Sequence, residues 1–337
     1  MGGSDGKLIT IGILGSGTMA RIHAESIVRS GLGKVAAIFS TGPNGADLAG
    51  KYGAKACSTA AEILENPEID AVVIATPTDT HAKYLRMAAA AHKHVLCEKP
   101  LVRTVAEADE MEGLFNGYDK TVAVGHVVRF TPEYESLKET VAGGKLGQIG
   151  IVRLGRCCSC PRGQDDWFRD FARSGGVMMD LMIHDLDFLE HAFGPVARVY
   201  GMRSLDRSNL TTDYALLVLR LKSGAIAHIE GSWAEPDNTF YTNYEVAGAT
   251  GLMDYDSRNE PSLVMQPKTP ASGSGPAGTL VPSNPAIRSP YNMEMLDFLD
   301  CVKSGKSPRT SLADGLRAVR LSFAAAEAIE KNAPVEI

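Results

Sequence analysis

The sequence predicts an α/β protein with two domains: a doubly wound parallel sheet over residues 1–125 and an α+β domain over residues 126–337. In the first part, apolar strand-like runs alternate with helix-like segments, as in parallel sheets that carry helices on both faces. In the second part, several strand-like runs follow one another without helices between them, which favours a large, mostly antiparallel open sheet. With 337 residues and 44% hydrophobic content, the chain can form two cores.

The elements of the first domain follow from short apolar runs, helix caps and glycine stops. We expect its strands at 8–14, 34–40, 54–58, 69–77, 94–100 and 120–126. We expect its helices at 18–30, 59–65, 80–92 and 104–115. Gly31 follows the first helix and ends it. The second and fourth helices begin with capping boxes, Thr59 with Glu62 and Thr104 with Glu107.

The second domain is expected to place helices on one face of its sheet. The helices are predicted at 131–144, 177–193, 291–303 and 312–331. The strands are predicted around 150–154 and at 196–204, 213–221, 225–233, 241–249 and roughly 261–265. Residues 266–290, rich in Pro, Ser and Gly, form a long excursion. Because large apolar sheet faces seldom stay exposed, we expect a homodimer or homotetramer formed through the uncovered face.

Composition excludes several kinds of partner. The net charge is −6 and no block of Lys and Arg is present, so neither nucleic acid nor a membrane surface is an expected partner. Apolar runs such as AVVIA at 71–75 are too short to span a bilayer, and the N-terminus lacks the apolar segment of a secretory signal. We therefore expect a cytoplasmic, reduced protein.

The six cysteines do not indicate a metal centre. Cys57, Cys97 and Cys301 lie alone in apolar segments and are interpreted as small buried hydrophobic residues. The other three form the run CCSC at 157–160, which lacks the paired CxxC spacing of zinc sites. No metal is predicted.

A glycine-rich turn between the first strand and the first helix indicates dinucleotide binding. The run GSGTMA contains Gly15, Ser16, Gly17, Thr18 and Met19, followed by alanine. The first glycine permits a tight turn, the second lets a pyrophosphate approach the backbone, and the alanine permits close packing of the helix on the strand. In the first βα unit of such an array, this motif predicts a Rossmann domain that binds NAD or NADP.

The end of the second strand favours NADP slightly over NAD. NAD sites usually place a carboxylate there, on the ribose hydroxyls. Here Ser40 and Thr41 occupy that point, and their hydroxyls could bond a 2′-phosphate that a carboxylate would repel. No arginine follows at once, so NAD remains the alternative.

Two further strand ends place polar groups at the same edge of the sheet. The run ATPTDTH contributes Ala75, Thr76, Pro77 and His81 to this crevice, although the same residues also form a turn and a helix start. The run CEKPL brings Glu98 and Lys99 to the carboxyl end of the fifth strand, which Pro100 ends because proline cannot donate to a ladder.

The predicted helix at 177–193 carries a candidate acid–base pair. Asp180 and His184 are four residues apart and therefore share a helix face among apolar neighbours. A buried histidine beside a carboxylate can move a proton, but it can equally form a structural pair in a core. A metal site made by both with His191 is a third reading. Asp185 and Asp187 are expected to support the site rather than to react.

The runs GSGTMA, CEKPL and SGGVMMDLMIHDLD occur in this order and together resemble the Gfo/Idh/MocA oxidoreductase family. Further resemblance lies in RLKSGAIAHIEGSW and YEVAGATGLMDYD, so it extends over almost the whole chain. It implies that Lys99 faces the nicotinamide and the reacting oxygen, that Glu98 helps to fix the cofactor, and that Asp180 and His184 are the acid–base pair. It also implies site positions for Trp167 and, in GHVVRF, for His126 and Arg129.

The resemblance implies an oxidoreductase that transfers a hydride between the nicotinamide and a sugar, inositol or related polyol carbon. Lys99, Asp180, His184 and Trp167 suit a substrate with many hydroxyls and a sugar-like face. Two alternatives on the same fold are a redox-assisted glycosidase that keeps its NAD and a non-catalytic regulator that senses dinucleotide. A metal-dependent hydrolase built on the helix face is a third.

Overall fold

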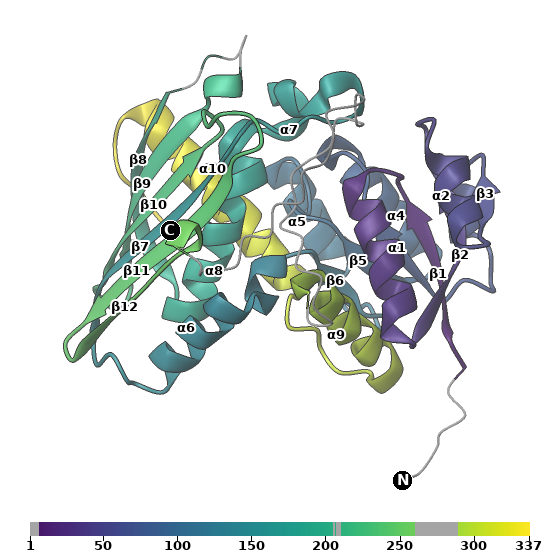
Figure 1. The fold of residues 1–337 in the computed structure, drawn as a ribbon, viewed down its shortest axis with the longest axis horizontal. Helices are drawn as coiled ribbons and strands as arrows, with labels where there is room; N and C mark the ends of the chain where they lie inside the picture. The colour runs from purple at the N-terminus through teal and green to yellow at the C-terminus, as the bar shows by residue number, and fades with distance from the viewer. Residues whose placement is uncertain (1–6, 205, 207–209, 260–288) are drawn as a thin grey trace.

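Two sheets form the frame of the molecule (Figure 1). The computed structural model describes residues 7–204, 206, 210–259 and 289–337. The first sheet has the strand order β3-β2-β1-β4-β5-β6 and is parallel throughout. The order reverses beside β1, so β1 and β4 flank the switch point at which such sheets bind ligands.

The elements of the first sheet match the predicted alternation. The strands are β1 (Ile9–Leu14), β2 (Gly33–Phe39), β3 (Lys55–Cys57), β4 (Ala71–Ile74), β5 (His94–Cys97) and β6 (Val122–Val124). The helices are α1 (Thr18–Ser30), α2 (Gly45–Lys51), α3 (Ala61–Leu64), α4 (His81–Ala90) and α5 (Val105–Leu114), with a 3₁₀ turn η1 (Thr78–Thr80) before α4. Strands β1 and β4 are buried along their whole length, as expected of a sheet covered on both faces.

Local signals set several helix ends as predicted. Helix α1 ends at Gly31, whose φ of 66° is left-handed. Helix α5 begins with the capping box of Thr104 and Glu107. Helix α2 was not predicted, because its glycines lower helix propensity. It forms because it packs against β2 and β3 and buries Leu48 and Ala49.

The second sheet has seven strands in the order β12-β11-β7-β10-β9-β8-β13. Only β7 and β10 pair in parallel, so the predicted, mostly antiparallel sheet is confirmed. The strands are β7 (Ile149–Cys158), β8 (Val196–Ser204), β9 (Tyr214–Leu221), β10 (Ile226–Ser232), β11 (Phe240–Gly248), β12 (Gly251–Asp256) and β13 (Val335–Glu336). Strands β12 and β13 were not predicted, and the strand and excursion expected at 261–265 and 266–290 lie outside the described residues, apart from 289 and 290.

One face of the second sheet packs against helices. These are α6 (Pro132–Ala142), α8 (Ile183–Phe193) and α10 (Leu312–Lys331), and the short helix α7 (Phe171–Ser174) precedes α8. Along β9 the residues alternate strictly between buried and less buried, which marks one covered and one uncovered face. The uncovered face carries exposed apolar side chains from four strands: Ile151, Met202, Leu216, Val218 and Leu252. Assembly through this face stays a prediction.

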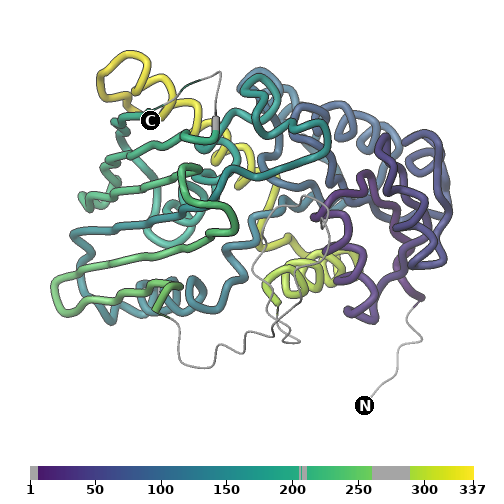
Figure 2. Tube along the Cα trace, turned by 45° about the horizontal axis from the view of Figure 1, so that its top comes forward, coloured from purple at the N-terminus to yellow at the C-terminus, as the bar shows by residue number. Residues whose placement is uncertain are grey.

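The last helices return to the first sheet. Helix α9 (Pro290–Ser304) packs against α1, where the Ser26 hydroxyl donates to Asn292 Oδ1 at 2.7 Å. Helix α10 begins beside β6 and ends against β8, so it contacts both sheets (Figures 1 and 2). The division at residue 125 remains a prediction, because the helices from 290 onwards hold the two sheets together.

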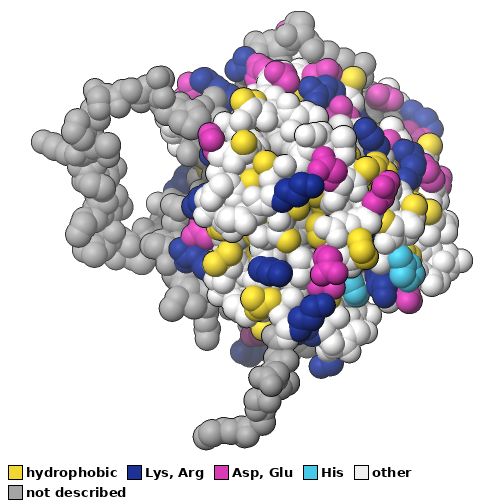
Figure 3. Space-filling view, turned by 90° about the vertical axis from the view of Figure 1, so that its right-hand side faces the viewer, with side chains coloured by type: hydrophobic (Ala, Val, Ile, Leu, Met, Phe, Trp, Pro, Cys, Tyr) yellow, Lys and Arg dark blue, Asp and Glu magenta, His cyan; other side chains and the backbone are white. Residues whose placement is uncertain are grey.

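The surface agrees with the charge pattern of the sequence. On the face seen in Figure 3, lysine and arginine side chains are interspersed with aspartate and glutamate rather than gathered in a block of one sign. Within the described residues, no helix is long and apolar enough to cross a bilayer.

Candidate active site

The loop after β1 has the geometry of a phosphate-binding turn. Gly15 has a φ of +122°, and a Cβ there would overlap the carbonyl oxygen of Ala75 at the end of β4. A Cβ at Gly17 would meet no atom within 4 Å, so the start of α1 is open. No side chain caps α1 and no acid lies in its first turn, where Thr18 and Met19 are half-buried. Free N–H groups at a helix start favour an anion, so the chain's residues fit a dinucleotide pyrophosphate.

Hydroxyl groups surround the end of β2. The Ser16 and Ser40 Oγ atoms lie 2.6 Å apart, and the Gly42 N–H donates to Ser40 Oγ at 3.0 Å. Thr41 is exposed beside them. The Ser40 hydroxyl is therefore held by its neighbours, and the binding of an adenosine ribose or its phosphate here stays a prediction.

The loops after β4 and β5 are tied together by His81. Its Nδ1 lies 2.8 Å from the Pro100 carbonyl oxygen and its Nε2 lies 2.9 Å from that of Thr76. The ring is buried, and burial lowers its pKa. The Thr80 hydroxyl donates to Thr76 Oγ1 and to the Pro77 carbonyl, each at 2.7 Å. This arrangement shapes the crevice, and contacts of these residues with a cofactor stay predictions.

Lys99 and Asp180 meet although they come from different parts of the fold, the loop after β5 and the helical segment before α8. The Lys99 ammonium donates to Asp180 Oδ1 at 2.8 Å and to the Asp180 carbonyl oxygen at 2.5 Å. Both side chains keep some exposure, 15% and 12%. Asp180 lies in the π-helical segment Met178–Met182 that precedes α8, where the sequence predicted regular helix. A cation and a carboxylate thus lie together at the carboxyl end of β5.

His184 stands near this pair as a half-buried imidazole. Burial first, and then the nearby Lys99, Arg156 and His126, hold its pKa well below the usual value. The ring is therefore neutral at neutral pH. Its Nδ1 has no hydrogen-bond partner among the described residues. The resemblance implies that Asp180 and His184 act as a pair, and in the structure the Asp180 carboxylate accepts a hydrogen bond from Lys99.

His126 and Arg129 belong to a buried ionic cluster. Arg129 donates to Asp187 Oδ2 at 2.8 Å and to Oδ1 at 2.6 Å, and its guanidinium lies 3.1 Å from Asp314. Neither ring nitrogen of His126 has a hydrogen-bond partner among the described residues, and Asp187 lies 3.8 Å away. The guanidinium of Arg129 is directed at these carboxylates, so its contact with substrate stays a prediction.

Trp167 lies on a segment with a strained backbone. The 3₁₀ segment η3 (Gln164–Arg169) contains Asp165 and Asp166 at φ 55° and 50°, and the Trp167 ring stacks on Phe168 with centroids 3.9 Å apart. Left-handed non-glycine residues are costly and are often found at functional sites.

The structure adds residues to the site region that the sequence did not single out. The Gln164 side chain fills the space where a Cβ of Gly42 would lie, so η3 reaches the loop after β2. Arg156 donates to both oxygens of Asp185 at 2.8 and 2.9 Å and contributes positive charge near His184. Glu294 lies near Glu98, from a helix far along the chain. No local motif marks these residues, because each acts through a distant partner.

The proposed alternative metal ligands do not converge. Among the described residues, the only group with ligand spacing is His23, Glu98 and Glu294, which excludes a cluster of Asp180, His184 and His191 in this arrangement. The six cysteines are free and buried, and burial raises the pKa of Cys157 and of Cys160 to about 11.

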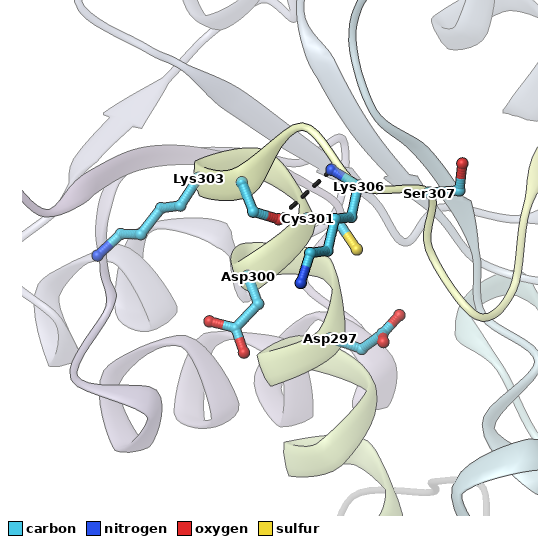
Figure 4. A pocket seen from close by; sticks show the side chains of 7 residues that line it. Asp297, Asp300, Cys301, Lys303, Lys306 and Ser307 are labelled. Carbon is cyan, nitrogen blue, oxygen red and sulfur yellow. Dashed lines mark hydrogen bonds between the residues drawn. The ribbon is translucent and has the colours of Figure 1, made fainter.

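A surface hollow of about 450 Å³ lies away from these groups, at the C-terminal end of α9 (Figure 4). It is lined by Asp297, Asp300, Cys301, Lys303, Ser304, Lys306 and Ser307. None of the predicted site residues lines it, so it does not form part of the candidate site.

Comparison with known proteins agrees with this geometry. Residues 9–126 match the oxidoreductase family with an NAD-binding Rossmann fold, and residues 134–254 match the GFO/IDH/MocA C-terminal domain. Myo-inositol 2-dehydrogenase of Thermotoga maritima is 30% identical over 97% of this chain and 98% of its own. Inositol 2-dehydrogenase of Rhizobium meliloti is 26% identical over 98% and 99%. The crystal structure of GenD2 from gentamicin A biosynthesis, in complex with NAD, has a TM-score of 0.87 at 25% identity and covers 100% of this chain and 98% of that one.

Replacing Gly15 should weaken dinucleotide binding. In Gly15→Ala, the new methyl group collides with the Ala75 carbonyl and forces the turn open. We expect at least a roughly tenfold loss of NAD(P)H affinity by fluorescence titration, since a misplaced turn loses the phosphate contacts. Gly50→Ala on α2 is the matched control, because its methyl group would meet no atom within 4 Å. Equal affinity in both variants would contradict the assigned role of the loop.

Proposed function

Since the chain belongs to the Gfo/Idh/MocA oxidoreductase family, we propose that it transfers a hydride between a nicotinamide dinucleotide and a carbinol carbon of a sugar, inositol or related polyol. One observation carries this proposal. The Lys99 ammonium and the neutral imidazole of His184 lie near each other at the carboxyl end of β5, where open α/β sheets bind ligands.

The cofactor would lie along the carboxyl ends of the parallel strands. Gly15, Ser16, Gly17, Thr18 and Met19 would hold the pyrophosphate, through free N–H groups at the start of α1. Ala75, Thr76, Pro77, His81, Glu98, Lys99 and His126 would border the path towards the nicotinamide. When bound, the nicotinamide supplies the hydride donor or acceptor.

Ser40 and Thr41 support NADP rather than NAD as the preferred coenzyme. Their hydroxyls replace the usual carboxylate, and Ser40 Oγ already accepts a hydrogen bond from the Gly42 N–H. A 2′-phosphate would meet no negative side chain at these two positions. Gln164, which reaches this loop from η3, would add an amide donor.

The chain's own residues provide the proton chemistry. Lys99 donates a hydrogen bond to the reacting oxygen and stabilises the negative charge that develops there. His184 takes the hydroxyl proton in oxidation and returns it in reduction, and its lowered pKa keeps it in the basic form at neutral pH. Asp180 holds the Lys99 ammonium in place and balances its charge.

The substrate class rests on the relatives and on the lining of the site. Two relatives named inositol 2-dehydrogenases match along nearly the whole chain. The lysine, the aspartate and the histidine can bond neighbouring hydroxyls, and the half-buried Trp167 offers an apolar face to a ring. A polyol therefore suits the site better than an apolar alcohol.

A substrate panel tests the proposal directly. Inositols, aldoses and keto-sugars are tested in both directions with NAD(H) and NADP(H), following absorbance at 340 nm. We expect turnover with at least one polyol and a higher kcat/KM with NADP(H). If the protein binds dinucleotide but turns over no member of the panel, the result would favour the non-catalytic regulator or the redox-assisted glycosidase that keeps its NAD. Absence of dinucleotide binding would contradict the whole assignment.

Removing the Lys99 ammonium should abolish turnover but not cofactor binding. We expect Lys99→Met to lower kcat by about a hundredfold or more, the usual effect of losing a group that stabilises charge at the reacting oxygen. NAD(P)H titration should give an affinity close to that of the parent protein. Lys83→Met, which removes an exposed lysine on α4, is the control. Near-normal kcat in Lys99→Met would refute the role.

The pH profile of oxidation should report His184. Because its pKa lies well below 6.5, protonation of this ring should not slow oxidation between pH 7 and 6.5. His184→Ala should lower kcat and shift the remaining activity to high pH, where hydroxide replaces the missing base. The exposed His92, changed to Asn, serves as the control. An unchanged profile in His184→Ala would exclude this ring as the base.

A further inference from the structure

Three acid–base side chains meet in the core beneath the candidate site. His23 comes from α1, Glu98 follows β5, and Glu294 comes from α9. Their exposed fractions are 0%, 7% and 2%. One ligand atom from each lies within 4.8 Å of the other two, and His23 Nε2 is 2.6 Å from Glu98 Oε1. The cluster lies where the first and last parts of the chain pack together.

Among the described residues, no hydrogen bond stabilises a negative charge on Glu294. Neither carboxylate oxygen has a hydrogen-bond partner among the described residues, and the nearest acid–base groups include the acidic Glu98. An ionised carboxylate in such surroundings is far more costly than a neutral one. Glu98, by contrast, receives the short hydrogen bond with His23 and lies next to Lys99 along the chain. Two nearby carboxyl groups in such different surroundings should hold one proton between them.

Glu98 sets the position of the proposed catalytic lysine. Its Oε2 accepts a hydrogen bond from the Lys99 N–H at 3.2 Å. A Cβ at Gly125 would lie 2.9 Å from the same oxygen, so Glu98 also packs tightly against the end of β6, just before His126. A change in the charge or position of Glu98 would therefore move both the backbone at Lys99 and the segment that leads into His126.

We propose that Glu294 is a positioning residue, a buried neutral carboxylic acid that keeps a single negative charge in the cluster and thereby holds Glu98, and through it Lys99, in place. The inference rests on the proposed function only for the role of Lys99. The protonation of Glu294 follows from the cluster itself.

The charges around the cluster fix the direction of the titration. The groups that act on its two carboxyl groups or lie beside them are His23 of α1, Lys99 after β5, His81 of α4, and Tyr291 and Asp297 of α9; Arg156 of β7 acts on Tyr291. Burial, Glu98 and Asp297 raise the pKa of Glu294 well above its usual value. Burial also opposes ionisation of Glu98, but His23, Lys99 and His81 outweigh it and lower the Glu98 pKa.

The sign of the pH effect distinguishes this role from simple packing. Between the ordinary carboxyl pKa and the raised one, folded protein holds a proton on Glu294 that unfolded chain has released. The contribution of Glu294 to stability is therefore full at low pH and falls as pH rises, by about tenfold in the folding equilibrium for each pH unit. Glu294→Gln keeps the shape of the neutral acid and cannot ionise, so the variant should not lose this contribution to stability as pH rises.

The first experiment measures thermal unfolding of the parent protein and Glu294→Gln from pH 5.5 to 8.5. We expect the unfolding midpoint of Glu294→Gln, relative to that of the parent, to rise by about 2 °C for each pH unit. Asp300→Asn removes an exposed charge from the same helix, and the pH dependence of its unfolding midpoint should match that of the parent. Parallel profiles for Glu294→Gln would overturn the proposal.

Two measurements keep the inference testable if the variant does not fold. Infrared spectroscopy of the parent protein at pH 8 should show the carbonyl band of a protonated carboxyl group, and absence of this band would overturn the proposal. Metal analysis of the purified parent should find no stoichiometric divalent ion. An ion bound by His23, Glu98 and Glu294 would replace the proton, and finding one would overturn the proposal.

The positioning role has its own readout. NAD(P)H affinity of the parent should fall at high pH, when Glu294 ionises, and Glu294→Gln should keep its affinity there. The same pH dependence in both proteins would show that Glu294 does not position the site. None of these measurements uses turnover, so a protein inactive towards every polyol would still test the inference.

Discussion

The site depends on one contact, the bond between the Lys99 ammonium and Asp180. Lys99 follows β5 of the parallel sheet, and Asp180 lies in the π-helical turn that precedes α8 on the second sheet. The ammonium also bonds the Asp180 carbonyl oxygen, so it fixes the backbone as well as the side chain. A strand end and a helix start are thereby held at hydrogen-bond distance across the junction of the two sheets. In the proposed reaction, this closeness would bring cofactor and substrate together.

Buried ion pairs orient the helical segment that carries the site. Asp185 pairs with Arg156 of β7, Asp187 pairs with Arg129, and Asp213 accepts from the Val177 N–H at the segment's start. Burying such pairs costs desolvation, and their net stabilisation is small compared with apolar packing. Their partners lie on different elements, however, so a rotated helix would leave several charges unpaired. We infer that they specify the direction in which Asp180 and His184 point.

Burial and two cations held in ion pairs act together on the pKa of His184. Lys99 and Arg156 are held in place by their carboxylate partners, and their charges act with burial to lower the His184 pKa. The imidazole is therefore neutral where an isolated histidine would be partly charged. In the proposed reaction, the ion pairs of Lys99 and Arg156 would add to the effect of burial in keeping the His184 ring neutral.

The sequence by itself determined what depends on neighbours along the chain. The alternation of strands and helices, the end of α1 at Gly31, the capping box of α5 and the turn at Gly15 follow from local periodicity and backbone sterics. Only the tertiary structure decided the partner of Asp180, the π-helical turn, the formation of α2 and the approach of Glu294 to Glu98. Each of these results from packing between distant segments, whose energies no local pattern records.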